Sequence, residues 1–390
     1  MGGFWMRVLV LGVGAVGEVI AKHLAGEGGV SLSVADIDEL RLRRIKRMLR
    51  SRVETRIVGG DGFDEVVNDA DLVINSASPT INLDLMKTCL RYGVNYMDLA
   101  SDDIDKQLAM NRSWRRKEVL ALICMGEDPG LSNIYARYAA DKLDRVNSIK
   151  IRDGEYSKSR KYPLIALFSP EIFFDEILSP SLVYVNGRFR KLPALSGYEV
   201  YEFPEPVGKL SVYSVNHEEV YTLPRFIGKG VRYVDFKLAL ADELINATKL
   251  LKRIGLLRSR RMRVKNASVS PRDVFFALMP KPSEIAKHIE GYASLVVEVE
   301  GMYKGKAVTY SIYTLMSHEQ ANKLFRANAT SYLTGTVPAV VASMIARGEI
   351  EDVGVRVPEQ LDPTPVVERL TRHGILSYVE SSEEKLLARD

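Results

Sequence analysis

The stretch VLVLGVGAVGEVIAKHL, residues 8–24, joins a strand pattern to a helix pattern through three glycines. Its first four residues are continuously apolar, as in a parallel strand that is covered on both faces. Val16, Ile20 and Leu24 then recur at the spacing of one helix face. This order of strand, glycine turn and helix is that of a dinucleotide-binding unit, in which the helix amino terminus holds the phosphates.

Each of the three glycines has a physical role in such a site. Gly12 makes the tight turn, Gly14 lets the backbone approach the pyrophosphate, and Gly17 lets helix and strand pack closely. The alternative is that they are only turn residues of another α/β protein. The predicted cofactor contacts here are Gly12, Gly14, Ala15, Val16 and Gly17.

A second strand, VSLSVAD, ends on Asp36. A carboxylate at this place can accept hydrogen bonds from both hydroxyls of the adenosine ribose. An NADP site would carry a small residue here and a guanidinium just after it, whereas Ile37 and Asp38 follow. The sequence therefore favours NAD over NADP, with Asp36 and Ile37 among the contacts.

Strand and helix patterns continue to alternate through the first third of the chain. Strands are expected in TRIVGGD, ADLVINSAS, NYMDLAS and ALICMGED. Six strands with helices between them make a doubly wound parallel sheet, which binds ligands at its carboxyl edge. Residues at the strand ends either cap helices or contact the cofactor, and the further candidates are Asp61, Asn75, Ser76, Ala77 and Leu99.

Beyond about residue 146 the pattern changes to longer strands and hairpins. SLVYVNGRFRKL predicts a hairpin turning on Asn186-Gly187. Helices are expected near 169–178, 242–257 and 271–279. The predicted fold class is α/β: a doubly wound Rossmann domain over 1–128, a mixed α+β substrate and dimerisation domain over 129–320, and a helical tail over 321–390 that packs back on the first domain.

Two stretches beyond the first sheet carry candidate chemistry. In GEDPGL, Asp128 is expected to cap the next helix, with Pro129 at its first position. Capping alone explains Asp128, but a cap at the carboxyl edge of the sheet also faces the nicotinamide. Its free carboxylate oxygen would then be able to act on the substrate.

The second stretch is YSVNHEEVYTLPRF, residues 213–226, which is expected to be the loop after a strand. His217 is a base suited to proton transfer at neutral pH. Arg225 is suited to hold a carboxylate with two hydrogen bonds. An ammonium group would need a carboxylate from Glu218, Glu219, Asp102 or Asp103. The alternative is a hydrogen-bonded cluster on an exposed loop.

A metal site is not expected in this loop, because Tyr221 stands where the His-Glu-x-x-His pattern needs its second histidine. Cys89 and Cys124 are the only cysteines and form no Cys-x-x-Cys pair, so neither disulfides nor a thiolate metal site are indicated.

The charge pattern bears on partners and location. The net charge is +4, and the basic runs at 41–52 and 256–265 lack the interleaved aromatics of a nucleic-acid groove. No apolar run is expected to span a bilayer. A strand that begins by about Arg7 leaves no room for a signal peptide. We therefore expect a cytoplasmic protein that binds neither nucleic acid nor membranes.

These motifs resemble the saccharopine dehydrogenase family, which includes lysine 6-dehydrogenases and carboxynorspermidine dehydrogenases. The matching stretches span nearly the whole chain: VLVLGVGAVGEVIAKHLA, DLVINSASP, NYMDLASDD, GEDPGLSNIYA, HEEVYTLPR and ATSYLTGTVPAVVASMIARGEI. The resemblance implies an NAD(P)-dependent oxidoreductase acting on a C–N bond of an amino acid, with imine formation and hydrolysis. It also implies a homodimer built on the sheet of the second domain.

The resemblance divides between two activities. GEDPGL looks like saccharopine reductases, whose aspartate at the position of Asp128 lies in the substrate site, whereas Asp36 and the region 205–225 look more like lysine 6-dehydrogenases. A saccharopine site should hold several converging cations for three carboxylates, such as Arg225 with Arg232, Lys209 or Lys229. A lysine site needs one cation and one acid.

The candidate residues are therefore His217, Asp128 and Glu218 for catalysis, and Arg225, Asp103 and Tyr221 for substrate binding. The alternatives are a carboxynorspermidine dehydrogenase-like activity, or a regulatory protein that binds NAD and has lost turnover.

Overall fold

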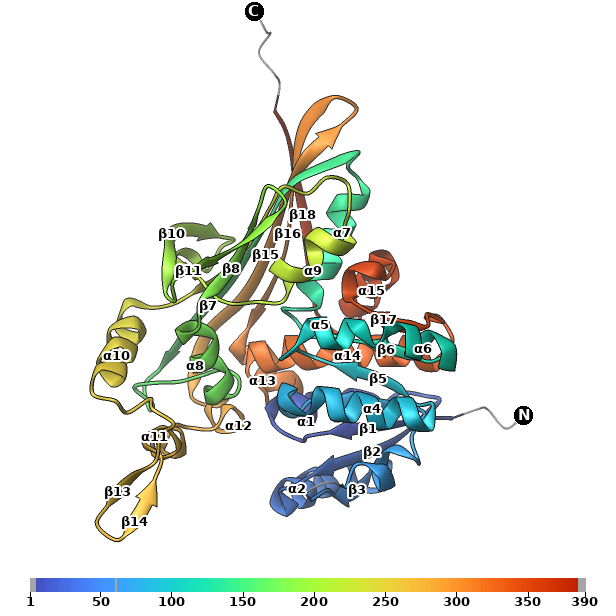
Figure 1. The fold of residues 1–390 in the computed structure, drawn as a ribbon, viewed down its shortest axis with the longest axis vertical. Helices are drawn as coiled ribbons and strands as arrows, with labels where there is room; N and C mark the ends of the chain where they lie inside the picture. Colours follow the sequence, from blue (N-terminus) through green and yellow to red (C-terminus); the bar gives the residue numbers. More distant parts are fainter. Residues whose placement is uncertain (1–4, 60–61, 385–390) are drawn as a thin grey trace, which may run out of the picture.

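The structure is a computed structural model that describes residues 5–59 and 62–384 (Figure 1). It contains one parallel sheet of seven strands and one mixed sheet of nine strands. Asp61, expected among the cofactor contacts, lies outside the described residues. The α/β class predicted from the sequence, with a Rossmann domain and a mixed second domain, is confirmed.

The first sheet has the order β17-β6-β5-β4-β1-β2-β3, and all its pairings are parallel. The direction of winding reverses between β1 and β4, which is where doubly wound sheets bind ligands. Leu11 pairs with Asn75, so the loops after these two strands leave the sheet side by side. The strands are β1 (Met6–Leu11), β2 (Val30–Asp36), β3 (Glu54–Ile57), β4 (Leu72–Asn75), β5 (Asn95–Asp98), β6 (Leu120–Leu122) and β17 (Gly354–Arg356).

Helices cover both faces of this sheet. Asp38 caps α2, because its Oδ1 accepts a hydrogen bond from Leu40 N at 2.9 Å. The helical stretch expected after β5 is divided into two helices at Met110. The helical elements are α1 (Ala15–Leu24), α2 (Glu39–Leu49), η1 (Arg50–Arg52), α3 (Asp64–Val67), η2 (Pro79–Ile81), α4 (Asn82–Tyr92), α5 (Ile104–Ala109) and α6 (Asn111–Lys117).

The second sheet has the order β10-β11-β12-β7-β15-β16-β18, with β8 pairing to β12 and β9 to β8. It is mixed, because β7 pairs parallel with β12 and antiparallel with β15. The strands are β7 (Arg145–Ser159), β8 (Ser181–Val185), β9 (Arg188–Leu192), β10 (Ser196–Phe203), β11 (Gly208–Ser214), β12 (Tyr233–Ala239), β15 (Ile289–Tyr303), β16 (Lys306–Ser317) and β18 (Ser377–Glu384).

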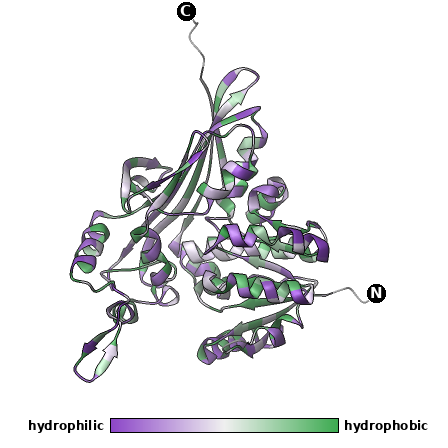
Figure 2. Ribbon diagram, in the orientation of Figure 1, coloured by the Kyte–Doolittle hydropathy of each residue, from purple (hydrophilic) through white to green (hydrophobic). Residues whose placement is uncertain are grey.

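The hairpin predicted at Asn186-Gly187 is confirmed between β8 and β9, and both turn residues have positive φ, as a primed turn requires. The helices expected in the second domain are also confirmed, at α8 (Pro170–Leu178), α10 (Asp242–Arg253) and α11 (Pro271–Leu278). Figure 2 shows that α10 has one hydrophobic and one hydrophilic side, typical of a helix with one face on the core. A small hairpin, β13 (Met262–Val264) and β14 (Ala267–Val269), follows α10.

The remaining helices lie mostly between the two sheets or beside them. They are α7 (Leu131–Asp141), α9 (Glu219–Phe226), α12 (Pro282–Ile285), α13 (His318–Phe325), α14 (Ala329–Ala346), η3 (Pro358–Gln360) and α15 (Pro363–Thr371). The tail packs on the first domain: a Cβ on Gly335 of α14 would lie 2.7 Å from Cβ of Val19 in α1. The tail is not wholly helical, however, because it adds β17 to the first sheet and β18 to the second.

Within the described part of the chain, α14 is one helix that is long and apolar enough to cross a membrane, although the sequence was not expected to contain such a run. Of its residues, 89% are buried inside the protein. Its apolar surface is therefore accounted for by packing between the domains.

Candidate active site

The glycine loop after β1 leaves space in front of the first helix. Gly12 has a φ of 90°, and a Cβ on Gly17 would lie 1.9 Å from the carbonyl oxygen of Gly12, so helix and loop touch here. A Cβ on Gly14, by contrast, would meet nothing within 4 Å. Gly14 is also the N-cap of α1 and offers no side chain to the free N–H groups. Ala15 and Val16 continue into the first turn. The loop thus fits a dinucleotide pyrophosphate.

Asp36 lies beside this loop at the end of β2. Its Oδ2 accepts a hydrogen bond from Val13 N at 2.7 Å, and its Oδ1 accepts one from Asp38 N at 2.8 Å. Each oxygen keeps a second lone pair for a ribose hydroxyl. Arg41 Nη1 lies 3.8 Å from Oδ2, and the side chain of Ile37 is exposed. The carboxylate therefore stands where the adenosine end of a dinucleotide would lie.

The ends of β4 and β5 lie next to the glycine loop. Ser76 Oγ donates a hydrogen bond to the carbonyl oxygen of Gly12 at 2.7 Å, and Ala77 lies against the same glycine. Asn75 is buried and accepts a hydrogen bond from Ala77 N at 3.0 Å. Leu99, after β5, approaches the turn at Gly126 through its carbonyl oxygen. The expected cofactor residues that the structure describes therefore gather along one edge of the sheet.

Asp128 does not cap the following helix, so that prediction was wrong. The helix α7 begins at Leu131 with Gly130 as its N-cap, and Asn133 Oδ1 accepts the hydrogen bond from Gly130 N at 2.9 Å. Gly130 has a φ of 136°, a conformation that suits glycine, so the turn extends one step further than Pro129 suggested. The carboxyl of Asp128 instead lies within hydrogen-bonding reach of Asp153 in the second domain.

The stretch at 213–226 is also not a loop throughout, contrary to expectation. It enters α9 at Glu219, with Glu218 as the N-cap and His217 just before it. Val220 and Leu223 are buried on one side of this helix, which explains why the segment folds although Pro224 lies within it. The helix start places two consecutive glutamates next to the histidine.

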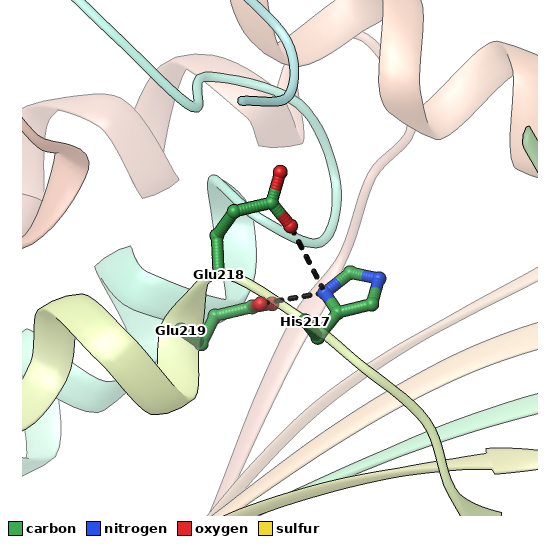
Figure 3. Close-up of side chains that lie close together, drawn as sticks. All are labelled: His217, Glu218 and Glu219. Carbon is green, nitrogen blue, oxygen red and sulfur yellow. Dashed lines mark hydrogen bonds and ion pairs between the residues drawn. The ribbon is translucent and has the colours of Figure 1, made fainter. Parts of the chain in front are cut away.

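His217 is held firmly within this helix start (Figure 3). Its Nδ1 lies 2.6 Å from Oε2 of Glu219 and 3.9 Å from Oε2 of Glu218. Its ring stacks on Phe236 of β12, with centroids 3.8 Å apart and planes 6° from parallel. Because Nδ1 faces the carboxylates, Nε2 is the nitrogen available for proton transfer.

The two glutamates connect His217 to both domains. Glu219 is fully buried and its Oε1 accepts a hydrogen bond from Ser132 Oγ at 2.7 Å. Glu218 Oε1 accepts one from Ser101 N at 2.6 Å, directly beyond the end of β5. The histidine is thereby fixed next to the edge of the sheet that carries the glycine loop.

A chain of buried hydrogen bonds connects the partner of Glu219, Ser132, to Glu359 in the carboxyl-terminal part of the chain. Ser132 lies 3.2 Å from Oδ1 of Asn133, whose Nδ2 donates a hydrogen bond to Glu359 Oε2 at 2.9 Å. Asn133 also approaches Thr222 of α9 at 3.2 Å. Burial raises the pKa of Glu359 to about 7.

Four further carboxyls line the second-domain side of the site, and we call them the acidic wall: Glu127, Asp153, Glu155 and Glu176. Asp153 and Glu155 occupy alternate positions of β7 and so share one face of the sheet. Glu127 comes from the turn after β6, and Glu176 from α8. Thr330 Oγ1 donates a hydrogen bond to Glu155 Oε1 at 2.6 Å.

Burial dominates the titration of the acidic wall. It raises the pKa of Asp153 to about 6, although a hydrogen bond from Asp128 and the charge of His217 lower it. Burial and the charge of Asp153 raise the pKa of Glu155 to about 8. Burial raises the pKa of Glu176 to about 8 against the charge of His217. Burial, then the neighbouring carboxyls, raise the pKa of Glu127 and of Asp128 well above the usual range.

For the pKa of His217, neighbouring charges outweigh burial. Burial by itself would lower the pKa of His217, but the charge and hydrogen bond of Glu219 raise it, as do the charges of Glu218 and Glu176. The result is a pKa of about 10. At neutral pH the ring is therefore an imidazolium that can supply a proton.

The site is rich in carboxyls and poor in basic groups, and burial keeps several of the carboxyls protonated at neutral pH. None of its carboxyls forms an ion pair with a lysine or arginine among the described residues, and His217 is the basic group they share. The seven carboxyls around it are Glu127, Asp128, Asp153, Glu155, Glu176, Glu218 and Glu219.

The residues expected to bind substrate lie outside this cluster. Arg225 Nη1 pairs with Asp105 Oδ1 at 3.1 Å, and its guanidinium lies 3.7 Å from the ring centre of Tyr221. The Tyr221 hydroxyl donates to the same Asp105. Asp103 caps α5, accepting a hydrogen bond from Lys106 N at 3.1 Å. The structure thus joins His217, Glu218 and Asp128, and separates them from Arg225, Tyr221 and Asp103.

The other cations proposed for a saccharopine site do not converge on it either. Lys229 Nζ donates to the carbonyl oxygens of Ala140 and Leu143 at 2.8 Å each. Lys209 lies 3.9 Å from Glu202 on β10, and Arg232 is exposed. The expected tricarboxylate signature is therefore not formed by these residues.

Sequence reasoning missed the acidic wall. The available signal was RDGEY within a long strand pattern, where Asp153 and Glu155 alternate on the face that also carries Ile149 and Ile151. Acids on the buried face of a strand require a partner or a function. His217, Glu218 and Glu219 also place one ligand atom each within 4.8 Å of one another, close enough to hold a metal ion, although no such site was expected.

Family comparisons define the class of the protein. A model described as the saccharopine dehydrogenase NADP binding domain matches residues 8–122, and one described as the saccharopine dehydrogenase C-terminal domain matches residues 126–375. The chain belongs to the saccharopine dehydrogenase family. It is an oxidoreductase of that family with an NAD(P)-binding first domain.

Two proteins are similar to this chain in sequence, and one solved structure is similar to it in fold. A carboxynorspermidine synthase of Vibrio cholerae is 28% identical, covering 95% of this chain and 96% of that protein. A carboxyaminopropylagmatine dehydrogenase of Synechocystis is 26% identical, covering 95% and 96%. Apo saccharopine dehydrogenase (L-Glu forming) of Saccharomyces cerevisiae has a TM-score of 0.73 at 14% identity, covering 97% of this chain and 100% of that one. The last similarity shows the shared fold.

Proposed function

We propose that the protein is an NAD-dependent oxidoreductase that makes or breaks a C–N bond of an amino acid, with His217 as the proton-transfer group. The observation that carries this proposal is the position of His217. It is hydrogen-bonded to Glu219 in the second domain, and its neighbour Glu218 is tied to Ser101 at the ligand-binding edge of the first sheet. A proton donor at this edge stands beside the place where a nicotinamide would lie.

The chemistry follows from the free nitrogen of the ring. A nicotinamide cofactor held at the loop of Gly12, Gly14 and Gly17 would supply or accept the hydride at the carbon that bears nitrogen. In the oxidative direction the amine must first lose a proton, and Nε2 of neutral His217 accepts it. Water then adds to the C=N bond, and its proton also needs an acceptor. In the reductive direction, imidazolium at the same nitrogen supplies the proton.

The raised pKa of His217 favours the reductive direction near neutral pH. With a pKa of about 10, the ring is largely protonated at pH 7 and is a proton donor. Oxidation gains the base it requires only at alkaline pH. The protein is therefore proposed to reduce a C=N bond under physiological conditions.

The charge of the site supports an amine-rich substrate over saccharopine. Three substrate carboxylates would meet the carboxyls around His217 without a converging arginine or lysine to hold them. Lysine, with one carboxylate and two amines, suits the site better. Polyamines that carry a carboxylate, as in the names of the relatives, suit it best. A carboxynorspermidine-type activity is thus preferred to a lysine 6-dehydrogenase or saccharopine dehydrogenase activity.

A substrate panel tests this function. The protein is mixed with NAD or NADP and with lysine, saccharopine or a carboxylated polyamine at alkaline pH, and the absorbance of reduced nicotinamide is followed. Reduced cofactor is expected with the carboxylated polyamine and not with saccharopine. Tight NAD binding without turnover of any candidate would instead support a regulatory protein.

Homodimerisation through the second sheet is proposed as well. The support is a hollow of about 710 Å³ on that sheet, lined by partly exposed aromatic residues that include Tyr201, Tyr313 and Tyr378. Aromatic residues are enriched where subunits meet. Light scattering should give the mass of two chains, and the mass of one chain would contradict the proposal.

A further inference from the structure

We propose that the acidic wall, Glu127, Asp153, Glu155 and Glu176, is a subsite for the ammonium groups of an extended polyamine arm of the substrate. The inference rests on the proposed function, since the wall adjoins His217 in the same site. It identifies the residues that select the substrate and the part of the substrate that they bind.

The elements that form the wall place it on one side of His217. Asp153 and Glu155 project from the same face of β7, and Figure 1 shows α8, which carries Glu176, beside that strand. The charge of His217 acts on both Asp153 and Glu176. Glu127 lies close enough to Asp153 and Glu155 for their charges to act on it. The carboxyls therefore form a continuous row that begins next to the proton-transfer group.

One oxygen atom of the acidic wall has no hydrogen-bond donor in the part of the chain that the structure describes. Glu127 is only 2% exposed, and its Oε1 has no hydrogen-bond partner among the described residues. A buried carboxylate oxygen without a partner is strongly unfavourable, and native structures contain few of them. Lysine-type ammonium groups bring three N–H donors each and no acceptor. A ligand ammonium would therefore satisfy this oxygen, and its positive charge would favour the ionised form of the surrounding carboxyls.

The spacing of the wall favours a long cation over a compact one. Alternate residues of a strand lie about 6.6 Å apart, so Asp153 and Glu155 offer two separate anionic positions along β7. Two oxygens bound to one Mg²⁺ lie within about 4 Å of each other. A short aliphatic chain with an amine at each end spans successive positions on the strand, whereas one metal ion does not.

Spermidine is a suitable probe, because it carries the amines without a carboxylate and needs no turnover. Its binding to the full chain is measured by calorimetry, with and without NAD, for the unmodified protein and for Glu155→Gln and Glu176→Gln. Both substitutions keep the size of the side chain and remove its charge. We expect saturable binding to the unmodified protein and a loss of about tenfold or more in affinity in each variant, in line with charge-assisted hydrogen bonds.

The matched control is Glu171→Gln, on the exposed side of the same helix as Glu176, where the side chain accepts a hydrogen bond from Ser169 Oγ at 2.8 Å. This variant should bind spermidine as tightly as the unmodified protein. Equal losses in the control and in the wall variants would overturn the proposal. So would saturable Mg²⁺ or Mn²⁺ binding that spermidine cannot displace, which would assign the carboxyls to a metal.

A series of ligands on the unmodified protein covers the case in which a variant does not fold. Affinity should rise from butylamine to 1,3-diaminopropane to spermidine, and equal affinities would overturn the proposal.

The experiments distinguish failure of the subsite from failure of the proposed function. If spermidine binding depends on the acidic wall but no amine is oxidised, the proposed function is contradicted and the subsite is supported. If turnover is unaffected by Glu155→Gln and Glu176→Gln, the subsite is contradicted and the proposed function is supported.

Discussion

Nδ1 of His217 and Oε2 of Glu219 lie 2.6 Å apart in a buried contact, and one residue separates them in the chain. The turn into α9 brings the two side chains together, and Ser132 holds the other oxygen of Glu219. The pair therefore resembles a proton-transfer dyad, in which a carboxylate fixes the tautomer and orientation of the imidazole.

Removing the imidazole should stop most of the chemistry. We expect His217→Gln to lower kcat by about 10²–10⁴-fold, the usual contribution of a positioned acid or base. NAD affinity should not change, because the glycine loop lies on another element. Steady-state kinetics and NAD titration measure the two effects. A variant with normal kcat would show that another group transfers the proton.

Removing the neighbouring charge should shift the pH profile. In Glu219→Gln the main group that raises the pKa of His217 is lost, so that pKa should fall from about 10. A lower pKa means neutral imidazole at lower pH, so the oxidative rate should rise at a lower pH than in the unmodified protein. The profile of kcat against pH is the measurement.

Glu218→Gln is the control for this shift, because its oxygen is 3.9 Å from Nδ1 and its charge acts less strongly than that of Glu219. It should move the profile in the same direction by a smaller amount. A profile that is unmoved in Glu219→Gln would mean that His217 does not set the pH dependence.

The same pair should affect stability. A histidine with a raised folded pKa stabilises the fold fully below its unfolded pKa, near 6.5, and this contribution is lost as the pH rises to about 10. The melting temperature of the unmodified protein should therefore exceed that of His217→Gln most at pH 6. The difference should shrink toward pH 10, and thermal denaturation across this range measures it. A constant difference would contradict the raised pKa.

Two glycines of the nucleotide loop should respond differently to alanine. Gly14→Ala meets no atom within 4 Å, so the protein should fold normally and lose NAD binding, because the methyl group occupies the place of the pyrophosphate. Gly17→Ala would place its Cβ 1.9 Å from a backbone oxygen and should lower the melting temperature strongly. Thermal denaturation and NAD titration separate the two. Normal NAD binding by Gly14→Ala would place the cofactor elsewhere.

The ribose contact can be tested through cofactor preference. Asp36→Asn removes the negative charge and keeps an oxygen for the hydrogen bond from Val13 N but not for the one from Asp38 N, so a small loss of stability is expected. We expect NAD affinity to fall by about tenfold, as for the loss of a charged hydrogen bond. NADP affinity should fall less, since its phosphate would meet one carboxylate fewer and would lie near Arg41. Equal losses for both cofactors would remove the ribose argument.

Local patterns determined the first domain almost completely. A continuous apolar strand, three spaced glycines and an amphipathic helix are readable because each depends on neighbours only a few residues away. The same holds for the Asn186-Gly187 hairpin and for helices such as α8. The wrong predictions arose where a local signal was compatible with two structures. Pro129 suggested an earlier helix start, and Pro224 suggested a loop.

Only the tertiary structure decided the composition of the site. The acidic wall combines a turn after the first sheet, a strand and a helix of the second domain, and it meets His217 from a fourth segment. Arg225 looked like a carboxylate anchor in the sequence, yet folding pairs it with Asp105. Charges act through space over a few ångströms, and which charges become neighbours depends on long-range packing that no short stretch of sequence encodes.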